Sequence, residues 1–157
     1  MIPRLGSRGQ GWVALQFALL AAIAVVGLLT RGSWPEPVQR TAGVLGAALL
    51  VAGAVGAVLA LTGLGSALTA VPAPLEGERL RTGGIYAVVR HPIYGSLILM
   101  SVGFALLTSP WALLVALLLA VELDLKRRVE EEFLSVAYPD YAEYRRAVPH
   151  ALVPGVW

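Results

Sequence analysis

A run of about 20 residues near the start of the chain carries no charge. Residues 11–30 read GWVALQFALLAAIAVVGLLT and contain no Asp, Glu, Lys or Arg. A helix of about 20 apolar residues is long enough to cross the ~30 Å hydrocarbon core of a bilayer. A cleaved signal peptide is the competing interpretation, with Arg4 and Arg8 as its basic flank. The run is long for a signal and no small-x-small cleavage site follows it, so the sequence favours a retained span.

Three further apolar stretches follow. Residues 41–64 form a second candidate span, and small residues four apart in it, such as Gly53 and Ala57, allow helix backbones to pack closely in lipid. Residues 93–108 and 111–125 are shorter apolar stretches separated by a Ser-Pro dipeptide, which is typical of a tight turn. We therefore expect four transmembrane helices, the last two forming a hairpin.

The placement of the charges predicts the orientation of these spans. With four spans both termini face one side, which holds ten of the 12 Lys and Arg residues, whereas the other side holds Arg31 and Arg40. The positive-inside rule assigns the side with ten to the cytoplasm. Only 14% of the residues are charged, against about 25% in soluble domains. The prediction is one all-α domain over residues 1–157, a polytopic helical bundle in a bacterial-type plasma membrane, with a cytoplasmic C-terminal helical segment.

Composition excludes several kinds of site. The chain has no cysteine, which excludes disulfides, thiolate metal sites and cysteine nucleophiles. His91 and His150 are its two histidines, too few for a histidine-rich metal centre. A formal charge of +2 is too small to suggest nucleic acid. We therefore expect neither a metal ion nor a nucleic-acid partner.

Polar chemistry collects in the second half of the chain, first in residues 82–94 (TGGIYAVVRHPIY). Pro92 suits the first turn of a helix, because its missing N–H would have no partner there. Arg90 and His91 would then lie just before a helix N-terminus, whose free N–H groups favour anions. Such a corner could hold one end of a nucleotide-like cofactor. A plain membrane-interface boundary explains the same residue types equally well.

A charged segment continues the last apolar stretch over residues 126–134 (KRRVEEEFL). Each basic residue precedes a glutamate by four positions, so each pair shares a helix face. The segment is either a solvated helix with weak ion pairs or a source of glutamates for a cationic ligand or ribose hydroxyls. Glu122 and Asp124, just before it, are functional if they lie at membrane depth and solvated if the helix has already reached water.

Three tyrosines mark the last polar segment, residues 138–154. Tyr138, Tyr141 and Tyr144 are three apart, which places them loosely on one face if the segment is helical. Such a stripe is more often packing than a cofactor-stacking surface. His150, close to prolines near the C-terminus, is interpreted as structural or solvated.

Together these segments resemble the isoprenylcysteine carboxyl methyltransferase and phospholipid methyltransferase superfamily. The resemblance covers residues 64–154, and the first two spans match only in character. Two departures are mild: Gly84-Ile85-Tyr86 stands where Gly-Pro-Tyr is commoner, and Tyr138-Pro139-Asp140 replaces the commoner Phe-Gly run. The matching stretches are LGSALTAVPAPLEGERLRTGG (64–84), GGIYAVVRHPIYGS (83–96), the E-E-x-x-L pattern at Glu130, Glu131 and Leu134, and YAEYRRAVPHALVP (141–154).

The resemblance implies an S-adenosylmethionine-dependent methyltransferase that acts on a lipophilic substrate dissolved in the bilayer and leaves S-adenosylhomocysteine. It implies a cytoplasmic cofactor pocket within residues 64–154, covered by the C-terminal segment and without metal. The catalytic candidates are Glu131 or Glu130, as a base for an amine or hydroxyl acceptor, and Arg128 or Arg127, as a ligand for a substrate carboxylate. The acceptor class and the oligomeric state stay open. The cofactor-binding candidates are Gly84, Tyr86, Arg90, His91, Pro92, Tyr94, Glu130 and Glu131.

Two other functions compete with this one. Nicotinamide-dependent membrane reductases share a related C-terminal pattern, but they are normally much larger and have more spans. A non-catalytic small membrane protein or transporter would bind no cofactor and would tolerate loss of Arg90, His91 and the glutamates together.

Overall fold

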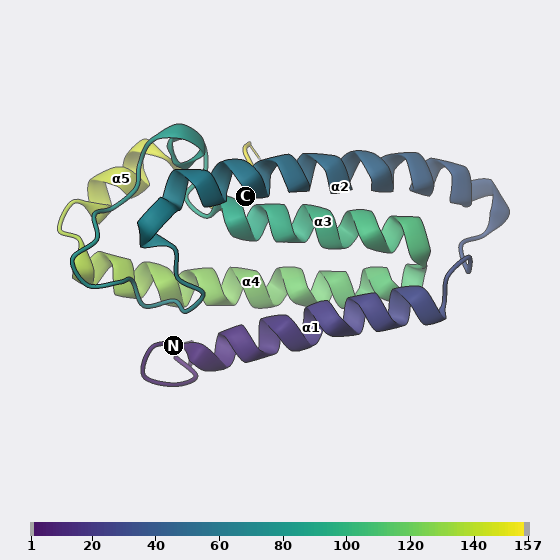
Figure 1. Ribbon diagram of the computed structural model, residues 1–157, viewed down its shortest axis with the longest axis horizontal. Coiled ribbons are helices and arrows are strands. Elements are labelled where there is room, and N and C mark those ends of the chain that lie inside the picture. The colour runs from purple at the N-terminus through teal and green to yellow at the C-terminus, as the bar shows by residue number, and fades with distance from the viewer. Residues whose placement is uncertain (1, 156–157) are drawn as a thin grey trace.

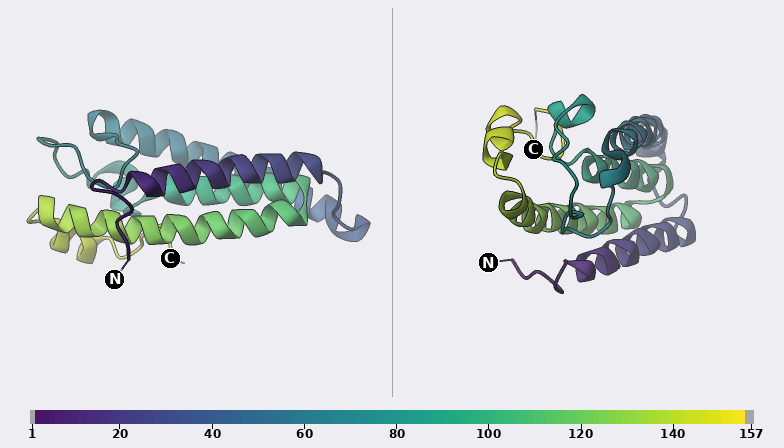
Figure 2. Two further views of the ribbon diagram at one scale, coloured as in Figure 1. Left: turned by 90° about the horizontal axis from the view of Figure 1, so that it is seen from below. Right: turned by 60° about the vertical axis from the view of Figure 1, so that its left-hand side comes forward.

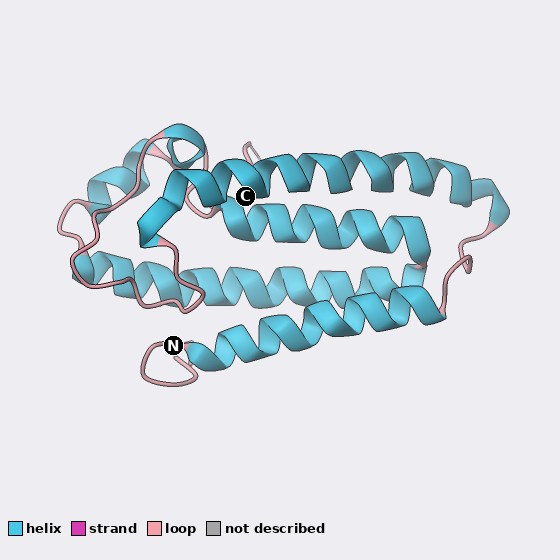
Figure 3. Ribbon diagram, in the orientation of Figure 1, coloured by secondary structure: helices cyan, strands magenta, loops and turns pink. Residues whose placement is uncertain are grey.

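The computed structural model describes residues 2–155, and every regular element in that range is a helix. Four long helices lie side by side, and the absence of strands among the described residues is visible in Figure 3. Shorter helical turns and one short helix surround one end of the bundle. The elements in chain order are α1 (Gln10–Leu29), α2 (Glu36–Leu64), η1 (Gly65–Ala67), η2 (Gly84–Ala87), α3 (Pro92–Thr108), α4 (Pro110–Ala137) and α5 (Tyr141–Ala147).

Helices α1, α3 and α4 start within one residue of the predicted stretches, whereas α2 starts at Glu36, ahead of the predicted start at residue 41. Pro92 and Pro110 are the first residues of α3 and α4, where a missing N–H costs nothing. Ser109 caps α4, because its hydroxyl accepts a hydrogen bond from the Ala112 N–H at 3.1 Å. Thr30, at the end of α1, donates to the same hydroxyl at 2.7 Å. The α3–α4 turn is thereby joined to the end of α1, and α4 continues beyond the apolar stretch to Ala137.

Close packing of α2 on α3 depends on glycine. The helices pair α2 with α3, α1 with α4, and α3 with α4 (Figure 1). At the α2–α3 contact, a Cβ atom added to Gly46 would lie 2.7 Å from the carbonyl oxygen of Gly103, and one added to Gly103 would lie 2.7 Å from that of Gly46. A Cβ atom added to Gly53 would likewise lie 2.8 Å from the carbonyl oxygen of Ser96. Small residues therefore allow the backbone contact that lipid-embedded helices favour.

Two of the helices satisfy the length and hydropathy requirements of a membrane span. These are α1, with a mean hydropathy of 2.4, and the helical stretch that begins with α2, with 2.5. Helix α3 is apolar but has 17 residues, and α4 becomes charged from Glu122 onward. Large apolar side chains project outward from the bundle, including Leu29, Val44, Val51, Leu118 and Val121. Over the described residues the fold is all-helical, and two of its helices are long and apolar enough to cross a membrane.

The two ends of the bundle differ. One end holds the N-terminal residues, the connection between α2 and α3, and α5, and the two views of Figure 2 show the same grouping from other directions. The opposite end holds the α1–α2 connection and the α3–α4 turn. All three polar segments of the second half therefore lie at one end.

Candidate functional site

The chain after α5 runs back along the start of α3. The backbone N–H of Arg90 donates to the His150 carbonyl at 3.1 Å, and that of His91 donates to the Ala151 carbonyl at 2.8 Å. The guanidinium of Arg90 adds hydrogen bonds from Nη1 to the carbonyls of Val148 and Pro149, at 2.6 and 2.8 Å. Arg90 thus fixes the C-terminal segment against the α3 N-terminus.

Glu131 joins this corner to α4. Its Oε1 accepts hydrogen bonds from Arg90 Nε and Nη2, at 3.1 and 3.0 Å, and lies 3.2 Å from His91 Nε2. Arg127 Nη1 is 3.4 Å from the same oxygen. Burial alone would raise the pKa of the Glu131 carboxyl, but the interactions with His91 and Arg90 outweigh burial and hold the pKa at about 2. Glu131 is therefore ionised at physiological pH and anchors the corner to α4.

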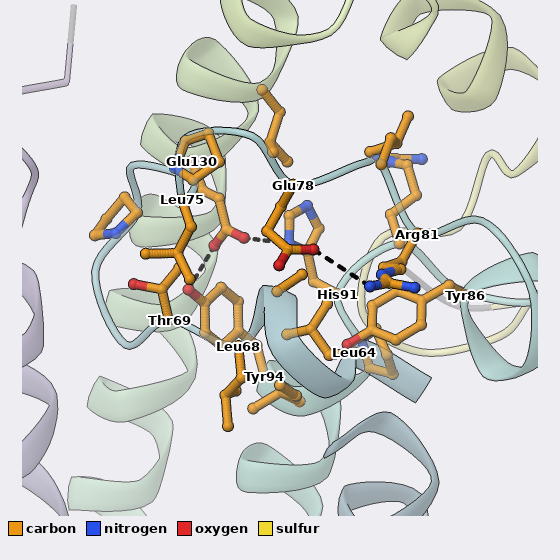
Figure 4. Close-up of a pocket in the computed structure, with 18 of the residues that line it drawn as sticks. Leu64, Leu68, Thr69, Leu75, Glu78, Arg81, Tyr86, His91, Tyr94 and Glu130 are labelled. Atoms are coloured by element: carbon orange, nitrogen blue, oxygen red, sulfur yellow. Dashed lines mark hydrogen bonds and ion pairs between the residues drawn. The ribbon is translucent and has the colours of Figure 1, made fainter. Parts of the chain in front are cut away.

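Glu130 is placed differently, toward the interior of this end of the bundle. Its Oε2 accepts a hydrogen bond from the Tyr94 hydroxyl at 2.5 Å, and its Oε1 lies 3.8 Å from His91 Nδ1 (Figure 4). The rings of His91 and Tyr94 are stacked, with centroids 5.7 Å apart and planes 2° apart. Two side chains of the α3 start therefore orient one carboxylate of α4.

A cavity of about 430 Å³ lies where these elements meet. Its walls come from α1, α2, the α2–α3 connection, α3, α4 and α5. A volume between about 300 and 1,000 Å³ is usual for small-molecule sites. The chain has five tyrosines, and all five line this cavity: Tyr86, Tyr94, Tyr138, Tyr141 and Tyr144. The tyrosine stripe, interpreted from the sequence as packing, thus also forms a wall of the cavity.

Hydrogen bonds hold two of these phenols in place. The Tyr144 hydroxyl donates to the Tyr86 carbonyl at 2.7 Å, and the Tyr86 hydroxyl donates to the Ala60 carbonyl of α2 at 3.3 Å. Burial raises the pKa of Tyr144 to about 12 and also raises the pKa of Tyr86 and of Tyr141. These phenols therefore remain protonated donors across the physiological range.

Two polar atoms of the cavity walls lack a partner among the described residues. The Tyr141 hydroxyl and Arg81 Nε are buried, and neither makes a hydrogen bond within residues 2–155. Arg81 uses Nη2 to contact Glu78 Oε2 at 3.3 Å, and both of these side chains line the cavity. Buried polar groups are rarely left unsatisfied, so the cavity suits a ligand that carries hydrogen-bond acceptors.

The structure gathers most, but not all, of the predicted site residues at the cavity. Glu131 lies behind Arg90 and His91 rather than in the wall. Gly84 opens η2 with a φ of +60° and is also outside the lining, and Arg128 is exposed, with Nε bonded to Asp124 Oδ2 at 2.8 Å. The predicted residues in the lining are Tyr86, Arg90, His91, Pro92, Tyr94 and Glu130. The binding roles of all these residues stay predictions.

Several lining residues were not predicted from the sequence. Gln16 and Phe17 reach the cavity from α1, Lys126 from α4, and Glu78 and Arg81 from the α2–α3 connection. The sequence did offer one indication that Gln16 is functional, because it is a lone polar residue inside an otherwise apolar stretch. Of the three pairs expected four apart, Arg127 with Glu131 forms, at 3.4 Å, whereas Arg128 contacts Asp124 and Lys126 contacts Gln16 instead of the glutamates. Glu122 and Asp124 are buried rather than emerging into water.

The fold and site define a class: an apolar helical membrane protein with an internal small-molecule cavity at one end of its bundle. The sequence model of the family described as Phospholipid methyltransferase matches residues 41–141, well over half of the chain. The chain belongs to this family of membrane methyltransferases, within the isoprenylcysteine/phospholipid methyltransferase superfamily.

One curated relative is the cobalt-zinc-cadmium resistance protein CzcN of Cupriavidus metallidurans. The two sequences are 32% identical over 140 residues, which is 88% of this chain and 60% of CzcN. The chain therefore spans less than two thirds of that relative's length. Among residues 2–155, no group of three or more His, Asp or Glu side chains is placed to hold a metal ion.

Proposed function

We propose that the protein transfers a methyl group from S-adenosylmethionine to a lipophilic substrate dissolved in the membrane. The observation that carries this proposal is the single cavity where the Arg90-His91-Pro92 corner, the acidic stretch of α4 and the tyrosines meet. Membership of a methyltransferase family supports the reaction type. The same cavity is also lined by Phe17 of α1 and Leu61 of α2, which supports a lipophilic acceptor.

The donors and acceptors in the cavity walls fit the cofactor. The Tyr141 hydroxyl and Arg81 Nε would hold its acceptor groups, since both lack partners among the described residues. Glu130 offers carboxylate oxygens to hydroxyl or ammonium groups, and the phenol rings of Tyr86 and Tyr144 offer flat apolar faces. When bound, the cofactor supplies a methyl carbon on a sulfonium, which an acceptor attacks while the electron pair of the broken C–S bond stays on sulfur.

The residues of the chain would contribute mainly by positioning. Holding an acceptor in line with the methyl carbon supplies much of the rate enhancement of such a reaction. A carboxylate acceptor needs no base, whereas an amine or hydroxyl must lose a proton. Because the pKa of Glu131 is about 2, this residue is a weak base. Glu130, which lines the cavity, is therefore the better candidate, and Glu131 holds the corner together.

We also propose that all four long helices cross the membrane, with the cavity and both termini on the cytoplasmic side. The cavity end of the bundle carries the N-terminal residues, α5 and the α2–α3 connection (Figure 1). Ten of the 12 Lys and Arg residues belong to these segments and to the adjoining end of α4, which supports this orientation.

One experiment tests activity and orientation together. Sealed inverted membrane vesicles and sealed right-side-out vesicles containing the protein are given S-adenosylmethionine with a labelled methyl group, which does not cross the bilayer. We expect label in the extracted lipid fraction from inverted vesicles only, and from both kinds after permeabilisation. His91→Ala should abolish it, whereas Arg40→Gln, at the opposite end of the bundle, should not. Label absent from permeabilised vesicles contradicts the function, and label from right-side-out vesicles alone contradicts the orientation.

A further inference from the structure

Lys126 is the only lysine of the chain and lies in the cavity wall. Only 1% of the surface of Lys126 is exposed to solvent. It stands on α4 next to the part of the cavity that α1 contributes through Gln16 and Phe17. A buried ammonium is costly unless an anion or several acceptors surround it, so its partners indicate what this part of the cavity accommodates.

Those partners are few. Nζ donates one hydrogen bond, to Gln16 Oε1 at 2.5 Å, and lies 5.1 Å from the centroid of the Tyr94 ring. An ammonium has three N–H donors. Within the part of the chain that the structure describes, no carboxylate oxygen comes within 4.0 Å of Nζ. The contacts fix the direction of the side chain and leave the ammonium without a direct ion pair among the described residues.

Two nearby glutamates attract Lys126 through space, but neither forms a direct ion pair with it. Glu122 and Glu130 lie one helical turn before and after Lys126 on α4. Glu130 is engaged by the Tyr94 hydroxyl. Glu122 is buried, and neither of its oxygens has a hydrogen-bond partner among the described residues. Lys126 therefore turns toward Gln16 and the cavity instead of pairing along its own helix.

The surroundings of this ammonium suit a lipid with an acidic head. Phe17, beside Gln16 on α1, is 60% exposed on the outer surface of the bundle and also lines the cavity, and Leu61 and Leu64 of α2 line it as well. An apolar chain can therefore lie against these side chains while its head group reaches Lys126. Charge-assisted hydrogen bonds from an ammonium to a carboxylate or phosphate are stronger than neutral ones.

We propose that Lys126, oriented by Gln16, binds an acidic oxygen group, a carboxylate or a phosphate, in the head of the methyl acceptor. The inference rests on the proposed methyl transfer and deepens it, because it makes the substrate an anionic lipid. Lys126 acts here as the residue that selects the head group, and Gln16 as its positioning residue.

Binding of matched single-chain lipids tests the inference. The purified full-length protein, loaded with S-adenosylhomocysteine in a neutral detergent, is titrated calorimetrically with oleate, oleyl phosphate, oleyl alcohol and oleylamine. We expect one or both anions to bind at least about tenfold more tightly than the alcohol, and the tighter anion identifies the head group. Lys126→Met should remove this preference, Lys126→Arg should keep most of it, and Arg40→Gln should leave it unchanged. The partition of a given lipid into micelles is the same for every variant, so it cancels when the affinities of the variants for that lipid are compared.

A second measurement needs no variant. Because Lys126 is the only lysine, the extent of its reductive methylation can be read from one peptide by mass spectrometry, apart from the terminal amine. Oleate or oleyl phosphate should protect it and oleyl alcohol should not. Equal binding of the anion and the alcohol, an unchanged preference in Lys126→Met, or protection by the alcohol would overturn the inference. Binding of S-adenosylhomocysteine, measured in the same preparation, separates this outcome from failure of the proposed function.

Discussion

Glu131 lies outside the lining of the cavity but contacts two residues that form its wall. Its carboxylate contacts Arg90 and His91, about 40 positions earlier in the chain, and these two residues also hold the C-terminal segment. Loss of the charge would leave the buried guanidinium of Arg90 without its counter-ion. Removing one partner of a buried ion pair is strongly destabilising, typically by about 3–5 kcal/mol. Glu131 should therefore affect stability at least as much as turnover.

The pH dependence of stability tests this role. The pKa of Glu131 falls from its ordinary 4.5 to about 2 on folding, so the carboxylate contributes stability above pH 4.5 that is lost as pH falls toward 2. The shift corresponds to at most about 3 kcal/mol. We expect the difference in melting temperature between the wild type and Glu131→Gln, measured in detergent, to be large at pH 6 and to shrink as the pH falls below 4.5. A difference that does not vary with pH would contradict the assignment.

At the scale of elements, the C-terminal segment contacts α3 so closely at Gly95 that no side chain fits at this position. A Cβ atom at Gly95 would collide with the carbonyl oxygen of Leu152, directly beside the hydrogen bonds from Arg90 and His91 to this segment. The segment includes Ala151 and Leu152, which are buried in the main core cluster. The position of this segment, and with it the shape of the site, therefore depends on a glycine.

Gly95→Ala should push the segment away from α3. Overpacking of this kind costs about 1–3 kcal/mol, so we expect a lower melting temperature and weaker binding of S-adenosylhomocysteine. Gly43→Ala is the matched control, because a Cβ at this α2 position meets nothing within 4 Å, and alanine favours a helix over glycine. Equal effects of the two substitutions would show that the segment tolerates displacement.

The sequence predicted elements better than it predicted contacts. The apolar stretches, the prolines at helix starts and the Ser-Pro turn gave helices close to α1–α4 and a hairpin of α3 and α4, because these signals are local. The resemblance drew attention to residues 64–154 and missed Gln16, since α1 matches the family only in character. Lys126 was interpreted as half of a pair on its own helix, because spacing along a helix cannot show that a residue of another helix offers a closer partner.

At the scale of the whole molecule, the cavity joins a polar end to an apolar body. Arg81 and Tyr141 lie toward the polar end, whereas Phe17 and Leu61 come from the two helices that meet the requirements of a membrane span. A water-soluble cofactor could therefore reach this cavity from the aqueous side, and a lipid could reach it from the membrane. We propose that the adenosyl cofactor binds in this cavity.

Calorimetric titration of the purified protein with S-adenosylhomocysteine, and separately with reduced nicotinamide dinucleotide, measures this binding. We expect saturable binding of S-adenosylhomocysteine at one site, weakened about three- to tenfold in Tyr141→Phe through loss of one hydrogen bond, and no binding of the nicotinamide. A folded protein that binds no S-adenosylhomocysteine, or that binds the nicotinamide in its place, would rule out an adenosyl-cofactor site in this cavity.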